Sequence, residues 1–152
     1  MEVFRLSRKK YPAELSGKGA AAYGARWNSP GIEMVYTAES RALAMAEVFV
    51  HLSLAMMPDD YLMLSIDIPS PVSIKALDIL SLPEDWADSP YKNETQAIGD
   101  RFISSREACI LKVPSSVVQG DFNYLLNPHH ADFKKISIAQ ITDFIIDRRM
   151  IK

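Results

Sequence analysis

The 152-residue sequence predicts a single α+β domain in which mixed or antiparallel strands carry flanking helices. Segments typical of strands and of helices follow one another without a regular βαβ repeat, which argues against a doubly wound parallel sheet. The chain has no internal repeat and no Gly/Ser-rich linker, so we expect residues 1–152 to form one compact unit. A chain of this length buries roughly two-thirds of its unfolded surface, enough for one core.

The N-terminal third predicts two strands separated by a long loop. Residues 2–7, EVFRLS, mix β-branched, aromatic and aliphatic side chains and predict the first strand. Residues 11–33 contain four of the six glycines and are expected to be mostly loop. Residues 34–38, MVYTA, then predict a second short strand.

A helix and a third strand are predicted next. Thr37 is a plausible N-cap, helix-forming residues continue to about Met57, and Pro58 ends the run. In residues 61–68, YLMLSIDI, aliphatic residues occupy every second position, which is the period of a half-buried strand.

The second half of the chain is expected to begin with a helix in residues 88–105, with Ser89 as N-cap and Pro90 in the first helical position. Residues 108–113, ACILKV, predict a strand that Pro114 ends. The apolar runs within residues 134–146 fit a strand or a helix equally well, because neither period dominates.

The composition narrows the class of protein. The formal net charge is −2, without the basic surplus typical of proteins that bind nucleic acids or anionic membranes. We find no apolar run of the ~18 residues that a membrane span needs and no secretory signal, so we expect a cytoplasmic protein. The single cysteine, Cys109, lies in an apolar run and is expected to pack in the core.

Glu47 is unusual because it lies within the apolar run ALAMAEVFV. On a helix, its face also carries Leu43, Ala44, Val50, His51 and Leu54. Burying an unpaired carboxylate costs several kcal/mol, so Glu47 must be paired, neutralised or directed into a cavity. Two interpretations stay open, a structural ion pair and a functional glutamate in a cleft.

Two further side chains precede that helix. Arg26 lies in GARWNS, within the glycine-rich residues 11–33, where a guanidinium can bind phosphate or carboxylate in a bidentate manner. Tyr36 ends an apolar run and could either stack on a planar ligand or fill the core.

Residues 15–52, LSGKGAAAYGARWNSPGIEMVYTAESRALAMAEVFVHL, closely resemble the signature of the RES domain, the toxin of RES–Xre toxin–antitoxin pairs. The signature consists of an Arg-Trp-Asn loop, a Tyr-Thr strand end and a helix that carries a glutamate. VFRL near the start, and VPSSVV followed by NYLLNPHH, are also similar to that family. Ala25 departs from the pattern, since the family often has a second glycine before the arginine.

The resemblance implies an ADP-ribosyltransferase-like fold and a toxin that cleaves the nicotinamide–ribose bond of NAD⁺. It implies catalytic roles for Glu47, Arg26 and Tyr36, and NAD⁺ contacts from these residues together with Ser115 and Asn123. NAD⁺ would be a substrate and not a reusable cofactor, consistent with the absence of a Gly-x-Gly-x-x-Gly motif. No metal is expected. Water, inorganic phosphate or a protein side chain could each be the acceptor.

The resemblance also implies a partner, an Xre-type DNA-binding antitoxin that covers the active site, and hence a homo- or hetero-oligomer. Direct contact with nucleic acid or a membrane is not expected. Three alternatives remain open: an ADP-ribosyltransferase that modifies a cellular protein, a non-catalytic partner-binding module, and a ribonuclease. The last would use His51, His129 and His130 as acid–base groups.

Overall fold

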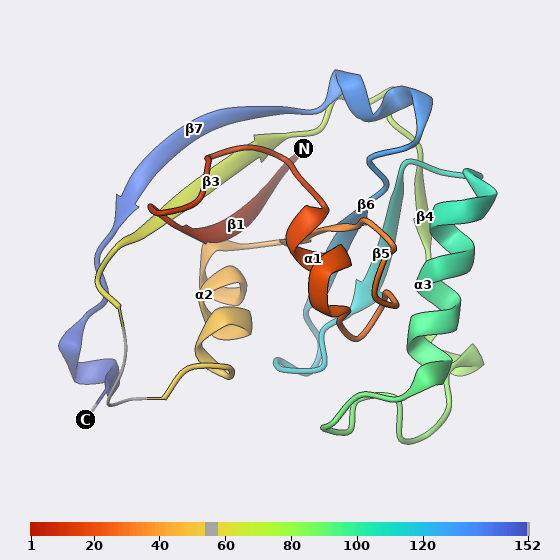
Figure 1. Ribbon diagram of the computed structural model, residues 1–152, viewed down its shortest axis with the longest axis horizontal. Helices are drawn as coiled ribbons and strands as arrows, with labels where there is room; N and C mark the ends of the chain where they lie inside the picture. The colour runs from red at the N-terminus through yellow and green to blue at the C-terminus, as the bar shows by residue number, and fades with distance from the viewer. Residues whose placement is uncertain (54–57, 152) are drawn as a thin grey trace.

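The computed structural model describes residues 1–53 and 58–151, which form one α+β unit around a seven-stranded sheet (Figure 1). The strands are β1 (Glu2–Arg8), β2 (Val35–Ala38), β3 (Tyr61–Asp67), β4 (Ile74–Ala76), β5 (Ile110–Pro114), β6 (Phe122–Leu126) and β7 (Ser137–Phe144). The helices are α1 (Lys18–Tyr23), α2 (Arg41–Phe49) and α3 (Asn93–Ser105), and the 3₁₀ turns are η2 (Ile79–Ser81), η3 (Ala131–Lys135) and η4 (Arg148–Ile151). None of the described helices has the length and hydropathy of a membrane span.

The sheet has the order β4-β5-β6-β2-β1-β3-β7 and consists of two parts that meet at one narrow junction. Only β4 and β5 are parallel, and all other neighbours are antiparallel. β1 pairs with β3 along its whole length, whereas its pairing with β2 is limited to Phe4 opposite Ala38. The mixed sheet without βαβ repeats confirms the predicted fold class.

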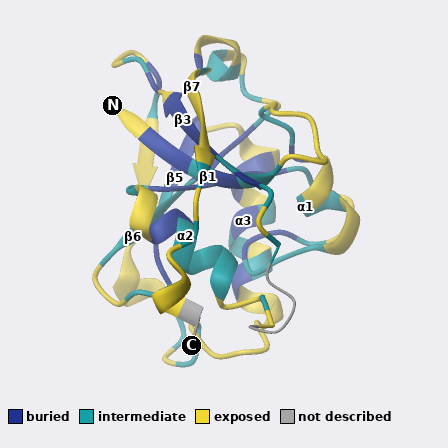
Figure 2. Ribbon diagram, turned by 90° about the vertical axis from the view of Figure 1, so that its left-hand side faces the viewer, coloured by how far each residue is buried: buried dark blue, intermediate teal, exposed yellow. Residues whose placement is uncertain are grey.

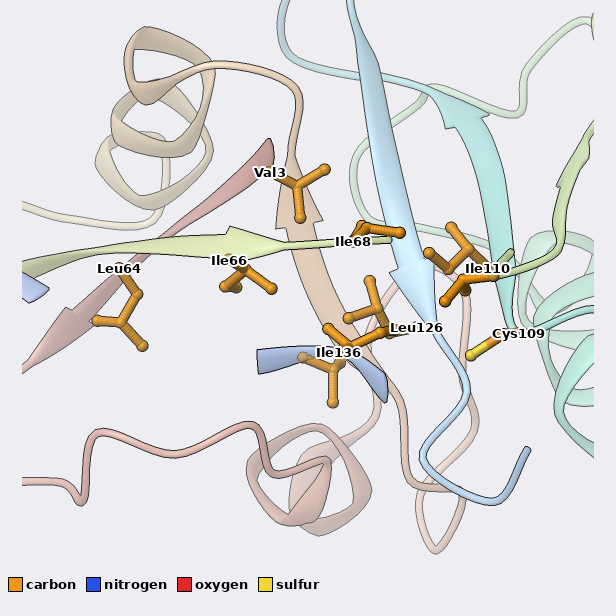
Figure 3. Packing of buried hydrophobic residues seen from close by; sticks show 10 residues of the cluster. Val3, Leu64, Ile66, Ile68, Cys109, Ile110, Leu126 and Ile136 are labelled. Atoms are coloured by element: carbon orange, nitrogen blue, oxygen red, sulfur yellow. The ribbon is translucent and has the colours of Figure 1, made fainter. Parts of the chain in front are cut away.

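Three groups of buried side chains form the core between the sheet and the elements packed on it. The first lies on one face of the sheet and includes Val3, Ile66, Cys109 and Leu126 (Figure 3). The second packs α3 against β5 and β6, and the third packs α2 against β1 and β3. The predicted core position of Cys109 is confirmed, because its side chain is fully buried in the first group.

Strand β3 is more buried than its alternating pattern predicts (Figure 2). The alternate residues Met63 and Ser65 are buried along with Leu64 and Ile66. The expectation of a half-buried strand is therefore wrong, because α2 and its neighbours cover the second face, where Met63 packs with Leu43 and Ala44.

The predicted boundaries of α2 are also wrong. Thr37 lies in β2, where its hydroxyl donates to the carbonyl of Tyr124 at 2.7 Å. Ser40 is the N-cap, since its hydroxyl accepts from the backbone N–H of Leu43 at 3.0 Å. The helix ends at Phe49 in a tight turn in which Leu52 N–H bonds to the Phe49 carbonyl, and the predicted end, Met57, lies outside the described residues.

The start of α3 differs from the prediction in the same way. The helix begins at Asn93 with Lys92 in the cap position, so Ser89 and Pro90 belong to the preceding loop. In that loop, the carbonyls of Trp86 and Asp88 accept hydrogen bonds from Arg26.

Four other segments can be compared with what the sequence predicts for them. Residues 11–33 are mostly loop, as expected, but they also contain α1. The ambiguous residues 134–146 form the end of η3 and strand β7. Strands β4 and β6 have no counterpart among the predicted elements, although β6 lies at the centre of the half-sheet that borders the cavity described next.

Candidate active site

A cavity of about 840 Å³ lies beside the junction between the two parts of the sheet. Its wall includes Phe4 to Leu6 of β1 and Tyr36 to Ala38 of β2, the two segments that pair at only one position. α2, β6, the loop that carries Arg26, the loop before α3 and the loop after β5 also contribute to the wall. The volume lies within the range typical of sites for small ligands and cofactors.

Glu47 lies on the cavity wall, one turn after the buried residues Leu43 and Ala44 of α2. Its carboxylate accepts a hydrogen bond from the Ser115 hydroxyl, with 2.7 Å between Oε1 and Oγ. It forms no ion pair with any described residue, so the geometry favours a carboxylate in a cleft over a structural ion pair. Of the other residues expected on its face, Val50 and His51 are exposed, and Leu54 lies outside the described residues.

Ser115 holds Glu47 from behind the cavity wall. Its hydroxyl oxygen accepts from the backbone N–H groups of Val117 and Val118, both at 3.0 Å. These two bonds occupy the oxygen lone pairs, so the hydroxyl proton is directed to Glu47. Ser115 is buried and is not among the residues of the cavity wall, so its geometry is that of a residue that positions Glu47.

Arg26 lies on the cavity wall with Glu47, and hydrogen bonds hold its guanidinium group. One terminal nitrogen donates to the carbonyls of Trp86, at 2.6 Å, and Asp88, at 3.0 Å. Partial burial lowers the pKa of Arg26, and the nearby Glu47 opposes that shift. A guanidinium stays charged despite such a shift, and its other nitrogens make no hydrogen bond to a described residue. It can therefore bind an anionic group in the cavity.

Tyr36 and Asn28 fix the loop that carries Arg26. The Tyr36 hydroxyl donates to Oδ1 of Asn28 at 2.6 Å and accepts from the backbone N–H of Trp27 at 3.1 Å. Asn28 is fully buried, and its amide nitrogen donates to the carbonyls of Ala20 and Ile32. Burial raises the pKa of the Tyr36 phenol, so the hydroxyl stays protonated. Tyr36 also lines the cavity, so a ligand there can contact it.

Asn123, the remaining predicted residue, is half-buried on the cavity wall. Its amide nitrogen donates to the Thr37 carbonyl at 3.3 Å, across the pair of strands β2 and β6. Arg26, Tyr36, Glu47 and Asn123 thus line one cavity, and Ser115 contacts it through Glu47.

Arg5 is a cavity residue that our sequence analysis missed. It lies in β1 between the buried residues Phe4 and Leu6 and lines the cavity. Burial lowers its pKa, and its guanidinium makes one long hydrogen bond, 3.5 Å to the carbonyl of Ser16, and no ion pair with a described residue. The signal was the same as for Glu47, a charged side chain inside an apolar segment.

The histidines do not form a cluster at the cavity. His51 lines it, but His129 and His130 do not. His130 caps η3 instead, because its Nδ1 accepts from the backbone N–H of Asp132 at 3.0 Å. No three metal-ligating side chains come together among the residues that the structure describes.

With this geometry established, comparisons with known proteins identify the family. The family model described as the RES domain matches residues 2–147. The chain belongs to the RES domain family. The match covers nearly the whole chain and includes every residue of the cavity wall named above.

Several relatives of this RES domain are similar over almost their full length. "Toxin Res" of Photorhabdus laumondii is 40% identical over 154 residues, covering 100% of this chain and 98% of that protein. "Prs ADP-ribosylating toxin" of a Sphingobium strain is 36% identical over 141 residues, covering 91% and 88%. "Toxin Res" of Yersinia enterocolitica is 33% identical over 152 residues, covering 99% of both.

A solved structure supports the fold of this RES domain. A chain in the crystal structure of the M. tuberculosis MbcT–MbcA toxin–antitoxin complex superimposes with a TM-score of 0.76 at 20% identity. The superposition covers 95% of this chain and 84% of the other. At this identity the likeness concerns the fold, which this chain shares with a protein of a toxin–antitoxin complex.

Proposed function

We propose that this RES domain is a toxin that consumes NAD⁺ by cleaving the bond between nicotinamide and ribose. The observation that carries the proposal is the Glu47 carboxylate, held by Ser115 on the wall of a cavity that also contains Arg26 and Arg5. One anionic group beside two cationic groups fits a dinucleotide whose pyrophosphate is negative and whose reacting ribose becomes positive. The names of its relatives support a toxin, and the name of one, an ADP-ribosylating toxin, supports chemistry at the ribose of NAD⁺.

The chemistry needs only one acidic group. When the bond between C1′ and the pyridinium nitrogen breaks, the electron pair leaves with nicotinamide, which becomes neutral and needs no proton. The ribose is left as an oxocarbenium-like cation, similar to that of glycoside hydrolysis. A carboxylate held in a partly desolvated cavity stabilises such a cation more strongly than one in water. Glu47 would perform this task, with one oxygen fixed by Ser115.

The arginines would bind the opposite charge. Arg26 has guanidinium nitrogens free of described partners, and Arg5 makes a single long hydrogen bond. Both can donate to pyrophosphate oxygens, for which a guanidinium fork is well suited. The ring of Tyr36 would contact nicotinamide or ribose, and Asn123 offers a further polar contact.

The acceptor completes the reaction by giving an electron pair to C1′ and losing a proton. Water would give ADP-ribose, inorganic phosphate would give its 1″-phosphate, and a protein side chain would give an ADP-ribosylated protein. The first two make the enzyme a glycohydrolase or a phosphorylase. The third is the second candidate function, favoured by the relative named as an ADP-ribosylating toxin. Mass spectrometry of the product, with and without phosphate and with cell extract, distinguishes the three.

Substitution of Glu47 tests the proposal. We expect Glu47→Gln to reduce kcat for nicotinamide release by about 10²–10³-fold, because the amide keeps the shape but loses the charge that stabilises the cation. Glu14→Gln, at an exposed glutamate that does not line the cavity, is the matched control and should keep normal activity. Full NAD⁺ consumption by the Glu47→Gln protein would refute the proposal.

As part of the same proposal, the domain acts together with an antitoxin of the Xre type that covers the cavity. The superposition on a chain of a toxin–antitoxin complex supports such a partner. Expression of the wild-type chain alone should arrest growth, whereas the Glu47→Gln chain should not. Harmless expression of folded, active wild-type protein would contradict this part of the proposal.

A further inference from the structure

The N-terminal half of α3 contacts the loop that carries Arg26 through one face of the helix. We call residues 25–28 the arginine turn, because the backbones of Ala25 and Asn28 close it with reciprocal hydrogen bonds of 3.0 and 3.4 Å around Arg26. The amide nitrogen of Gln96 donates to the carbonyls of both Ala25 and Asn28, each at 3.1 Å. Gln96 therefore bridges the two ends of the arginine turn.

Two further residues on the same helical face complete the contact. Asp100 accepts from the backbone N–H of Ser29 at 2.9 Å and from its hydroxyl at 2.5 Å, directly after the arginine turn. Gly99 allows the close approach, since a Cβ atom there would lie 1.6 Å from the carbonyl oxygen of Trp27. Positions 96, 99 and 100 lie on one face because they are three and four residues apart.

The segment that leads into α3 holds the tip of the Arg26 side chain. The carbonyls of Trp86 and Asp88 accept from the Arg26 guanidinium. The two ends of the arginine turn and the tip of the Arg26 side chain are thus all held by residues 86–100, a region in which the sequence analysis assigned no functional residue. Gln96 and Asp100 do not line the cavity, so any effect they have on a ligand there must pass through Arg26.

We propose that Gln96 and Asp100 are positioning residues that set the place of Arg26 in the cavity and thereby the affinity for the substrate. The kinetic part of this inference rests on the proposed function. A group that binds pyrophosphate interacts equally with substrate and transition state, so its displacement raises KM and leaves kcat nearly unchanged. This signature differs from that of Glu47, whose loss lowers kcat.

The test replaces Gln96 by methionine, which has a similar length but no hydrogen-bond donor. We expect Gln96→Met to raise KM for NAD⁺ about tenfold, with kcat within about twofold of wild type, as judged by nicotinamide release. Gln140→Met, at an exposed glutamine of β7, is the matched control and should match wild type. Asp100→Asn, which keeps one acceptor oxygen, should raise KM in the same direction by a smaller factor, and it replaces Gln96→Met if that variant does not fold.

A double-mutant cycle separates positioning from general stability. In an Arg26→Met background, Gln96→Met should change KM by less than about twofold, because the group through which Gln96 acts is gone.

Hydrogen exchange gives a readout without substrate: the amides of residues 25–28 should exchange faster in Gln96→Met, and those of α2 should not. Unchanged KM, an equal loss in the Arg26→Met background, or unchanged exchange in the arginine turn would each overturn the inference. Absence of nicotinamide release by wild type would instead refute the proposed function, while the exchange arm would still decide whether Gln96 orders the turn.

Discussion

The orientation of the Glu47 side chain depends on a single hydroxyl. The Ser115 oxygen accepts from two backbone N–H groups and must therefore donate to Glu47. A hydrogen bond to a charged group contributes about 1.5–3 kcal/mol, and an unpaired buried N–H costs a similar amount. The same hydroxyl thus links the stability of the 115–118 turn to the geometry of the carboxylate.

We predict that Ser115→Ala lowers kcat at least about tenfold and also lowers the free energy of unfolding by about 1–3 kcal/mol. Nicotinamide release and urea unfolding measure the two effects. Ser115→Thr, which keeps the hydroxyl, should restore most of the kcat. Ser137→Ala, at an exposed serine of β7, should leave both quantities unchanged. Wild-type kcat in folded Ser115→Ala would show that Glu47 does not depend on this bond.

Cys109 allows a prediction about pH. Burial raises the pKa of its thiol from 9.0 to about 11. Because the folded pKa is the higher one, the contribution of this group to stability is complete below pH 9 and is lost as pH rises from 9 through 11. Between pH 8 and pH 10.5, the free energy of unfolding in urea should decline less for Cys109→Ala than for wild type.

Wild-type Cys109 should also resist thiol reagents until the protein unfolds. Rapid labelling of the folded protein at pH 8 would contradict the fully buried position of this side chain.

Some of the residues at the cavity could be predicted from the sequence and others could not. A charge within an apolar run identified Glu47, and the same signal was present for Arg5 in VFRLS. The residue pattern also pointed to Arg26 and Tyr36, with a structural role left open for each, and the resemblance to the family added Ser115 and Asn123. The sequence could not show that the Tyr36 hydroxyl is occupied by Asn28, because that bond depends on how the loop folds against β2.

At the scale of elements, short-range signals failed where tertiary contacts competed with them. Thr37 and Ser40 are both good caps, but the register of β2 with β6 takes Thr37 into the sheet. Ser89 and Pro90 form a typical helix start, yet α3 begins only at Asn93, and the segment just before Ser89 is bonded to Arg26. The strong patterns of β1, β2, β3 and β5 predicted those strands correctly, whereas the three-residue β4 is too short for a periodic signal.

Two helical glycines provide a matched test of how α3 approaches the arginine turn. A Cβ atom on Gly99 would clash with the Trp27 carbonyl, whereas one on Gly19 in α1 would meet nothing within 4 Å. We predict that Gly99→Ala lowers the free energy of unfolding by about 1–3 kcal/mol, the usual range for overpacking. Gly19→Ala should be neutral or should raise stability by up to about 1 kcal/mol, since alanine favours helix. Equal stabilities of the two variants by urea unfolding would show that α3 does not lie so close to the turn.

At the scale of the whole molecule, the cavity lies where the sheet is weakest in backbone pairing. β1 and β2 share one paired position, and side chains from both strands line the cavity beside it. The net charge of the chain is −2, yet the cavity wall carries Arg5 and Arg26 against Glu47. The local charge is therefore opposite to the overall charge, as expected for a site that takes an anionic ligand.

This arrangement predicts that a pyrophosphate ligand stabilises the whole fold by holding the two parts of the sheet together. ADP-ribose at about 100 times its Kd should add about 2.7 kcal/mol to the free energy of unfolding. For a domain of this size that corresponds to a rise in Tm of about 5–10 °C, measured by calorimetry. Arg5→Met and Arg26→Met should each reduce the rise at fixed ligand concentration, whereas Arg101→Met, at an exposed arginine of α3, should not. Since nicotinamide lacks the pyrophosphate, it should give a much smaller shift at the same concentration; an equal or larger shift with nicotinamide would show that the arginines do not provide the main binding contacts.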